Sequence, residues 1–441
     1  MLKNIRHHFN FTNISLIIRG YPMIKAWKKL HYIDSLPLRL FDEFLIDQKK
    51  RIVDFHIRQN LFYQNLVKDP NEWTWDSLPI ITKEDIQVNL KDRIPSIIKQ
   101  YYISKTSGSS GNPFYYAKDK FCHALTWSYI QKCFSEHKVY GKKQARFYGI
   151  SKDFMSYYST RIKDFFLNRY RFNVFDLNDS AFEKWLINFS KNKYIYLNGY
   201  TSVMILFSKY LKSKGIILSE ICPSLKKCIV TSEMCFEDDK NLMETYFGIP
   251  VVNEYGASEL DLIAFENIDN EWIINTSTLF VEILDKNNLP VADGQTGRII
   301  ITSLFNKANP FIRYDVGDMG SIYRVNSKKV ILKNLEGRSE DFVLLPNGNK
   351  AIGLTFYYVT KSVIEKSNEI KEIKIIQTDI DAFKIEYVSK YELSIEQKKE
   401  ILRSMIDFLK YDIKVSYEKL NNLRRNKSGK LKQFTSLVKN K

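Results

Sequence analysis

Short β-like runs alternate with helical patterns four times between residues 145 and 247. The pairs, strand first, are 145–150 with 155–167, 173–175 with 180–188, 195–197 with 202–214, and 227–230 with 238–247. A strand followed by a helix, repeated, is typical of parallel sheets, because two parallel strands need a long crossover connection between them. The pattern therefore predicts an α/β domain built on a largely parallel sheet.

The pattern changes near residue 270, where short runs separated by polar turns favour antiparallel strands. After Gly337 a shorter region follows, with helices expected at 354–366 and 394–409 and strands at 372–378 and 382–388. A chain of 441 residues is too long for one compact core. We therefore expect a large α/β domain (1–336) with parallel sheets and a small β-rich subdomain, followed by a small mobile α+β domain (337–441).

A loop rich in hydroxyl groups and glycine lies between the strand-like runs 101–103 and 114–116. It comprises Thr106, Ser107, Gly108, Ser109, Ser110 and Gly111, followed by Asn112 and Pro113. Glycines let the backbone N–H groups face a ligand, and short hydroxyls add uncharged donors, which together suit a phosphate. A flexible Ser/Gly linker is the alternative. The Walker sequence of P-loop NTPases does not occur in the chain.

Composition narrows the class of protein. Hydrophobic residues make up 44% of the chain and aromatics 14%, which excludes disorder as the main state. The net charge of +17 favours anionic partners, but the cations are spread along the whole chain. Five cysteines without a Cys-x-x-Cys pair fit a reducing, cytoplasmic environment. No apolar run is long enough for an integral membrane segment. The basic segment 18–30 could contact a membrane peripherally or pack on the domain.

Two further motifs place acids beside glycines. Tyr255 and Gly256 follow the β-like run 250–252, and Glu259 comes three residues later. An aromatic ring can stack on a base, and the acid can hold a metal; a simple turn at the end of a strand is the alternative. Asp318 follows Gly317 and could accept both hydroxyls of a ribose. Its alternative is an aspartate that caps a turn.

Two motifs belong to the C-terminal third. Gly337 and Arg338 precede Glu340 where the chain enters the smaller domain, although the segment could be an ordinary linker turn. Gly429 and Lys430 place a lysine directly after a glycine within a basic tail, which could also be a disordered end.

The order of these motifs resembles that of the adenylate-forming enzymes, the superfamily of acyl-CoA synthetases, adenylation domains and luciferases. The chain is most similar to the phenylacetate–CoA ligase-like branch, including relatives associated with capsular polysaccharide gene clusters. The sequence Leu-Pro-Ile-Ile-Thr-Lys-Glu-Asp at 78–85 and Thr-Ser-Glu at 231–233 carry this finer resemblance. The resemblance extends from about residue 75 to about residue 435.

The resemblance implies a role for each motif residue. Thr106 to Gly111 would bind the phosphates of ATP. Tyr255 would stack on the adenine beside Gly256 and near Ser232 and Glu233, and Asp318 would bind the ribose with Arg338 nearby, so that all six belong to the nucleotide site. Glu259 would bind a Mg²⁺ ion, Lys430 would reach the reacting carboxylate and α-phosphate, and Glu340 would be the hinge. Two departures stand out. Phe114 replaces the basic residue that many members carry after the loop proline, and Glu340 replaces the usual Asp or Lys of the hinge.

The implied function is ATP-dependent activation of a small carboxylic acid as an acyl-adenylate, followed by transfer to a thiol, most simply that of coenzyme A. A carrier protein, or the amine or hydroxyl of a polysaccharide precursor, is the alternative acceptor. A second alternative is a non-catalytic basic protein that binds nucleic acid or a membrane, although the enzyme interpretation predicts no nucleic-acid partner. A degenerate member that binds nucleotide without turnover is a third. Aromatics between residues 147 and 200, among them Phe147, Tyr148, Tyr157 and Tyr158, could line an acyl pocket or belong to the core.

Overall fold

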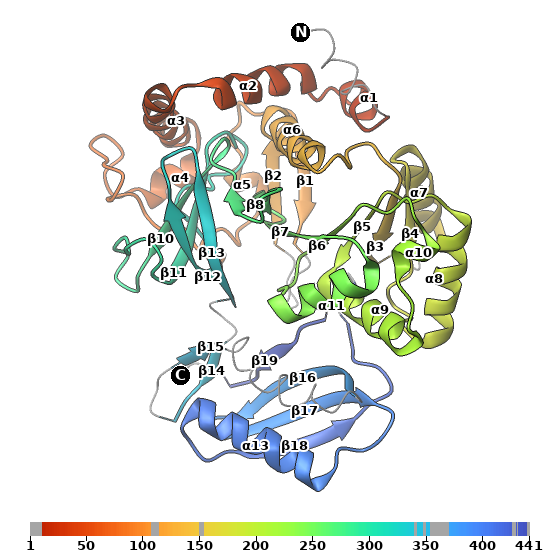
Figure 1. Ribbon diagram of the computed structural model, residues 1–441. Coiled ribbons are helices and arrows are strands. Elements are labelled where there is room, and N and C mark those ends of the chain that lie inside the picture. The colour runs from red at the N-terminus through yellow and green to blue at the C-terminus, as the bar shows by residue number, and fades with distance from the viewer. Residues whose placement is uncertain are drawn as a thin grey trace.

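The computed structural model describes residues 11–106, 114–149, 154–338, 342–346, 350–352, 370–425, 429 and 431–438. Figure 1 shows a large region that contains the N-terminal helices and the main sheet, and a smaller C-terminal region below it. We call residues 11–338 the large region and residues 342–438 the C-terminal region, in each case as far as they are described.

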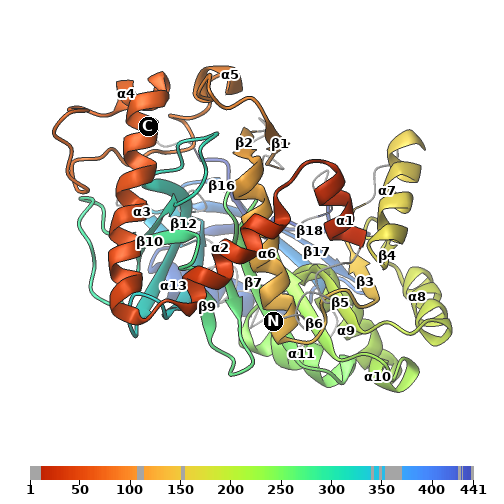
Figure 2. The same ribbon diagram turned by 90° about the horizontal axis from the view of Figure 1, so that it is seen from above.

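Helices at the N-terminus cover one side of the large region, as the view from above shows (Figure 2). They are α1 (Phe11–Ile18), α2 (Met23–Ser35), α3 (Leu38–Gln59), α4 (Leu61–Leu66) and α5 (Leu90–Arg93). Met23, Ala26, Leu30 and Ile33 recur three or four residues apart in α2, so they form one buried face. This face packs against α6 (Lys120–Glu136) in a shared core. The segment 18–30 is not one continuous helix, because the chain turns at Gly20 between α1 and α2. The part of the segment that lies in α2 packs on the domain.

The parallel half of the main sheet confirms the predicted α/β alternation, although the strand expected at 173–175 lies at 169–172. Its strands, in spatial order, are β4 (Arg169–Phe172), β3 (Gln144–Phe147), β5 (Tyr196–Tyr200), β6 (Lys227–Thr231) and β7 (Val251–Ala257). The helices between them are α7 (Phe154–Phe166), α8 (Asp179–Lys191), α9 (Thr201–Lys214), α10 (Leu218–Ile221) and α11 (Glu237–Phe247). Each of the four strand pairs is parallel.

The antiparallel half continues the same sheet. Strand β7 pairs antiparallel with β8 (Asp261–Glu266), and the sheet goes on through β9 (Trp272–Ile274), β13 (Val330–Arg338), β12 (Tyr314–Arg324), β11 (Gly297–Ser303) and β10 (Leu279–Leu284). The β-rich part thus begins at residue 261 rather than near 270. A separate antiparallel pair, β1 (Tyr101–Lys105) and β2 (Tyr115–Asp119), flanks the predicted phosphate loop, with Lys105 opposite Tyr115.

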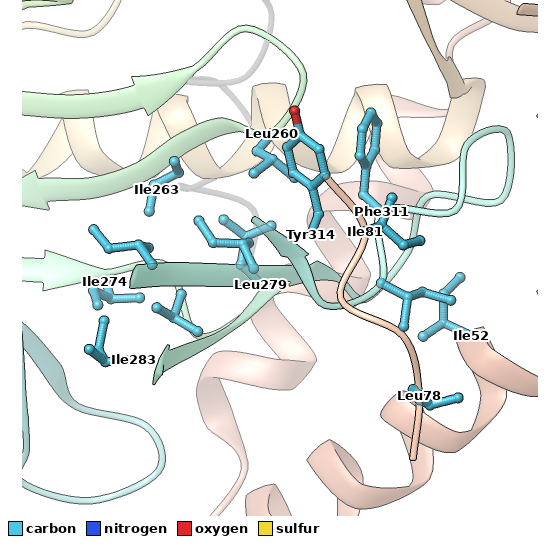
Figure 3. Packing of buried hydrophobic residues seen from close by; sticks show 14 of the residues in the cluster. Ile52, Leu78, Ile81, Leu260, Ile263, Ile274, Leu279, Ile283, Phe311 and Tyr314 are labelled. Carbon is cyan, nitrogen blue, oxygen red and sulfur yellow. The ribbon is translucent and has the colours of Figure 1, made fainter. Parts of the chain in front are cut away.

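Apolar side chains from both halves of the large region form extended cores. Figure 3 shows the one beneath the antiparallel half, where Leu78 and Ile81 lie with Phe311 and Tyr314. Fully burying an aliphatic or aromatic side chain contributes about 1.5–3 kcal/mol. Backbone hydrogen bonds also hold the segment 78–85 against the start of β12. Ile81 N donates to Arg313 O at 3.1 Å, and Asp315 N donates to Ile81 O at 2.8 Å. The motif that supports the finer resemblance is therefore part of the scaffold.

The C-terminal region is an α+β unit, as predicted. Its four strands lie in the order β18 (Lys414–Lys419), β17 (Ala382–Ser389), β16 (Ile370–Asp379), β19 (Phe434–Ser436), with α13 (Ile395–Leu409) packed on them. Ser394 and Gln397 form a reciprocal capping box at the start of α13. A small pair, β14 (Phe342–Leu344) and β15 (Lys350–Ile352), precedes this sheet. The helix predicted at 354–366 lies outside the described residues.

The two regions meet at α8, α9 and β16. An exposed ion pair joins Lys371 Nζ to Asp179 Oδ1 at 3.0 Å. The domain boundary at 336/337 stays a prediction, and Glu340, the predicted hinge, lies outside the described residues. Among the helices that the structure describes, none is both long and apolar enough to cross a membrane.

Candidate active site

Three of the predicted nucleotide residues come from different strands and meet at one place. The hydroxyl of Tyr255 in β7 donates to Asp318 Oδ2 in β12 at 2.7 Å. Asp318 lies directly opposite Arg338 in the register of β12 with β13. The ring of Tyr255 is buried and meets Trp272 edge-on, with centroids 6.2 Å apart. The structure thus brings together residues that the sequence places between 255 and 338.

A β-bulge directs Asp318. Arg298 pairs with Met319 and Ile300 with Asp315, so two steps along β11 (298 to 300) match four steps along β12 (315 to 319). Gly317 lies inside the bulge with φ of +79°, a conformation that costs other residues energy. The alternative interpretation, an aspartate that caps a turn, is therefore wrong, because the motif is an irregularity within one strand. Bulges of this kind change the direction of a neighbouring side chain.

The Tyr255–Gly256 motif also differs from its predicted form. The sequence predicts a strand that ends at residue 252, before the motif, but β7 continues through Ala257 and pairs with β8 along this stretch. A Cβ atom on Gly256 would lie only 2.5 Å from the carbonyl oxygen of Asp261. Glycine is needed here because the two strands approach closely.

Glu259, the predicted Mg²⁺ ligand, lies in the short connection between β7 and β8. Its side chain is buried, and Oε1 accepts a 3.1 Å hydrogen bond from the hydroxyl of Tyr314. No group of three potential metal ligands is found among the described residues. Mg²⁺ commonly binds through one or two carboxylates together with substrate phosphates, so a single carboxylate fits an ion that arrives with ATP.

Lys118 is a buried cation that contacts the chain on both sides of Glu259, at Ser258 and at Asp261. Its Nζ forms an ion pair with Asp261 and lies 3.4 Å from the carbonyl oxygen of Ser258. The lysine is 2% exposed, so its charge requires a partner. The only signal in the sequence was a lysine inside the apolar run of β2, whose partner is 143 residues away.

Ser232 and Glu233 lie directly after β6. Ser232 has φ of +70°, an unusual conformation for a residue other than glycine. Glu233 accepts two backbone hydrogen bonds through its carboxylate, from Ser202 N at 2.7 Å and from Leu431 N at 3.0 Å. The carboxylate therefore links the start of α9 to the C-terminal region, while a role in nucleotide binding stays a prediction.

Thr106 and Phe114, which flank the predicted phosphate loop, are joined by two hydrogen bonds. Thr106 N donates to Phe114 O at 2.9 Å, and Phe114 N donates to Thr106 Oγ1 at 3.3 Å. The loop residues Ser107, Gly108, Ser109, Ser110 and Gly111 lie outside the described residues. Phe114 is buried and packs edge-on against Phe311, with centroids 6.4 Å apart.

Arg93, at the end of α5, is a buried cation near the end of this loop. Its guanidinium lies 5.1 Å from the centroid of the Phe114 ring, and Nη2 donates to Tyr115 O at 2.6 Å. Within the described part of the chain, Nε and Nη1 are buried without a hydrogen-bond partner. Burial lowers the pKa of Arg93 to about 10, which leaves it charged at neutral pH. Nothing in the local sequence marks this arginine.

The C-terminal tail enters the large region at Gly429. This residue has φ of +92°, and a Cβ atom on it would lie 2.8 Å from Val174 Cγ2 and 3.6 Å from Tyr200 Cε2. Leu431, two residues on, donates its N–H to Glu233. Lys430 itself lies outside the described residues, but its two neighbours in the chain contact the large region.

The aromatic residues predicted for the acyl pocket separate into two groups. Phe147 is fully buried and stacks on Phe172 with centroids 4.7 Å apart, so it belongs to the core. Tyr148 packs against Tyr200 with ring centroids 4.6 Å apart, and the Arg146 guanidinium carbon lies 4.0 Å from the centroid of the Tyr148 ring. Burial raises the pKa of the Tyr148 hydroxyl, which keeps it neutral. Tyr158 is half exposed on α7, and the side chain of Tyr157 lies outside the description.

Comparison with known proteins agrees with this architecture. Residues 346–441 match the family of CapK C-terminal domains. Protein CapK of Staphylococcus aureus is 24% identical over 445 residues, covering 95% of this chain and 93% of that protein. The structure of 2-hydroxyisobutyryl-CoA ligase in the postadenylation state, with R3-HIB-AMP, superposes with a TM-score of 0.68 at 13% identity, covering 92% of this chain and 91% of that one.

The same ligase in its thioesterification state, with 2-HIB-AMP and CoA, gives a TM-score of 0.54 at 13% identity over 91% of each chain. The chain has the fold of the adenylate-forming ligases, as its motifs indicated. In sequence it is similar to protein CapK along nearly its whole length.

Proposed function

We propose that the protein activates a carboxylic acid with ATP, forming an acyl-adenylate and pyrophosphate. The observation that carries the proposal is the docking of the C-terminal tail: Gly429 packs on Val174 and Tyr200, and Leu431 binds Glu233 next to the predicted adenine site. Lys430 is joined to both residues by peptide bonds. A tail held in this way can deliver one cation to the reacting atoms.

The residues divide between binding and charge stabilisation. Asp318, opposite Arg338, is suited to bind the ribose, and Tyr255 both contacts Asp318 and offers a ring to the adenine. Thr106 and the hydroxyl- and glycine-rich loop after it would bind the phosphates. Since Phe114 replaces a cation of the family pattern, we propose that Arg93, which lies over its ring, supplies the missing positive charge.

The chemistry needs cations and N–H donors rather than a base. The substrate carboxylate is ionised at neutral pH, and one of its oxygens attacks the α-phosphorus while the bond to the pyrophosphate oxygen breaks in line. Negative charge accumulates where two anions meet, so fixed positive charge provides most of the catalysis. Lys430 would stabilise that charge on the α-phosphate. A bound Mg²⁺ would neutralise phosphate charge, and Glu259 is the residue that would hold it.

The acceptor in the second half-reaction is proposed to be the thiol of coenzyme A. Its sulfur attacks the acyl carbonyl carbon, the thiol proton goes to solvent, and AMP leaves. A carrier-protein thiol, or a sugar amine or hydroxyl, is the second candidate. Release of AMP measured with and without coenzyme A separates the two. Faster AMP release in the presence of coenzyme A supports coenzyme A as the acceptor. A rate of AMP release that coenzyme A does not change supports the other acceptors.

A further inference from the structure

Arg425 joins three parts of the chain at the place where the C-terminal region meets α9. Its Nη2 forms an ion pair with the carboxylate of Glu372 in β16. Its Nη1 donates to Ser202 Oγ in α9 at 2.9 Å and lies 3.4 Å from the carbonyl oxygen of Gly429. The side chains of Arg425 and Glu372 are only 7% and 12% exposed, so these bonds are shielded from water.

Glu233 makes the complementary contact from the other side. Its carboxylate accepts the N–H of Leu431 in the tail and the N–H of Ser202 in the first turn of α9. Ser202 is therefore contacted twice, at its hydroxyl by Arg425 and at its N–H by Glu233. The first turn of a helix carries unpaired N–H groups and a partial positive charge, which favour a carboxylate at this position.

The geometry requires arginine rather than any cation. Glu372 and Ser202 belong to different regions, and a planar guanidinium can serve both at once through separate nitrogens, whereas an ammonium group acts as a single point of charge. Charge-assisted bonds in a shielded site are stronger than those at a surface. The exposed pair of Lys371 with Asp179 also crosses the boundary, but both side chains are 55% exposed, and such pairs contribute little.

We propose that Arg425, Ser202 and Glu233 form a clasp that fixes the tail from Gly429 to Leu431 against the large region. Arg425 is a positioning residue in this account: it touches no reacting atom but holds the segment that carries Lys430. The catalytic consequence rests on the function proposed above. The clasp should therefore serve the adenylation step and be dispensable for the acceptor step.

Hydrogen–deuterium exchange of the full chain without ligands tests the clasp. In Arg425→Ala we expect exchange at least tenfold faster in peptides covering 200–206 and 429–436, with no change in α13. Ser202→Ala, which leaves the Arg425–Glu372 pair intact, should have a similar but smaller effect, and Arg425→Lys should be intermediate. Lys371→Ala is the matched control and should not differ from the wild type. Unchanged exchange at the tail, or equal acceleration throughout the C-terminal region, would overturn the proposal.

Activity provides a second readout. In Arg425→Ala we expect the kcat of pyrophosphate release to fall at least tenfold with the KM for ATP within about twofold, and transfer from supplied acyl-adenylate to be unchanged. Equal loss of both half-reactions, or no loss, would contradict the positioning role. If the wild type releases no pyrophosphate with any acid, the proposed function fails, and the exchange experiment still decides whether the clasp exists.

Discussion

The hydroxyl of Tyr255 and the carboxylate of Asp318 are 2.7 Å apart although 63 residues separate them in the chain. In the main sheet, three strands (β8, β9 and β13) lie between β7, which carries Tyr255, and β12, which carries Asp318. The sheet must therefore curve until its antiparallel half approaches the end of the last parallel strand. This curvature assembles a proposed nucleotide site from two halves of one sheet.

Removal of the Asp318 carboxylate should weaken ATP binding. A carboxylate that accepts the ribose hydroxyls makes one or two hydrogen bonds to a charged group, so Asp318→Ala should cost roughly 2–4 kcal/mol of binding free energy. Titration calorimetry with ATP measures this directly.

Tyr255→Phe is the control for that experiment, because it removes the hydrogen bond to Asp318 but keeps the ring and the carboxylate. We expect a smaller loss of about 0.5–1.5 kcal/mol. Unchanged ATP affinity in Asp318→Ala would refute the ribose assignment. Equal losses in both variants would mean that Asp318 acts only by orienting Tyr255.

The two half-reactions should respond differently to Lys430→Ala. We expect acyl-adenylate formation to fall on the order of 100- to 1,000-fold, because a group that stabilises developing charge is removed. Transfer from supplied acyl-adenylate to the acceptor should persist. Lys414→Ala removes an exposed lysine of the same region and should leave both steps unchanged. Loss of both steps in Lys430→Ala would contradict this division of roles.

The buried cation beside Phe114 should act on phosphates rather than on the nucleoside. Arg93→Met is expected to weaken ATP binding more than tenfold while adenosine binding changes less than twofold, because only ATP carries the triphosphate. Arg93→Lys keeps the charge and should recover part of the affinity. Both are measured by competition with a fluorescent nucleotide. Equal losses for ATP and adenosine would show that Arg93 has only a structural role.

Stability of the large region should decline in mild acid because of His56. This histidine is fully buried; Nε2 lies 2.9 Å from Asn306 O and donates to it, while Nδ1 accepts from Asn60. Burial lowers its pKa from 6.5 to about 4. The unfolded chain takes up the proton first, so the stabilisation is complete above pH 6.5 and is lost as the pH falls toward 4. At pH 5 the loss from this group is about 2 kcal/mol.

Urea unfolding at several values of pH from 7.5 to 5 measures this loss. Burial also lowers the pKa of His123 to about 4, so this histidine likewise makes the free energy of unfolding fall as the pH decreases. His56→Gln should be less stable at pH 7.5 but should show a shallower decline than the wild type. An identical slope in the two proteins would rule out His56 as a source of acid sensitivity.

The sequence predicted those features that depend on local patterning. The alternation from 145 to 247 and the helical pattern at 394–409 indicated the right elements, because side-chain periodicity follows the geometry of each element. The continuation of β7 through Tyr255 and Gly256 was not predictable in the same way. Whether that segment is a loop or a strand depends on β8, a partner that only the folded sheet supplies.

The buried charges were predictable only in part. Lys118, Arg93 and Arg425 each find partners far away in the chain or at a backbone carbonyl, and a single sequence does not reveal such pairings. Two neighbouring aromatic residues also have different environments. Phe147, the last residue of β3, is buried in the core, whereas Tyr148 follows the strand and packs on Tyr200 near the docked tail.

Activation of an acid by ATP is measured as pyrophosphate release from ATP and Mg²⁺ across a panel of carboxylic acids, with Lys430→Ala as the inactive control. We predict release that depends on one class of acid, requires Mg²⁺ and is lost in the variant. Absence of release with every acid, together with absence of ATP binding by calorimetry, would contradict the account.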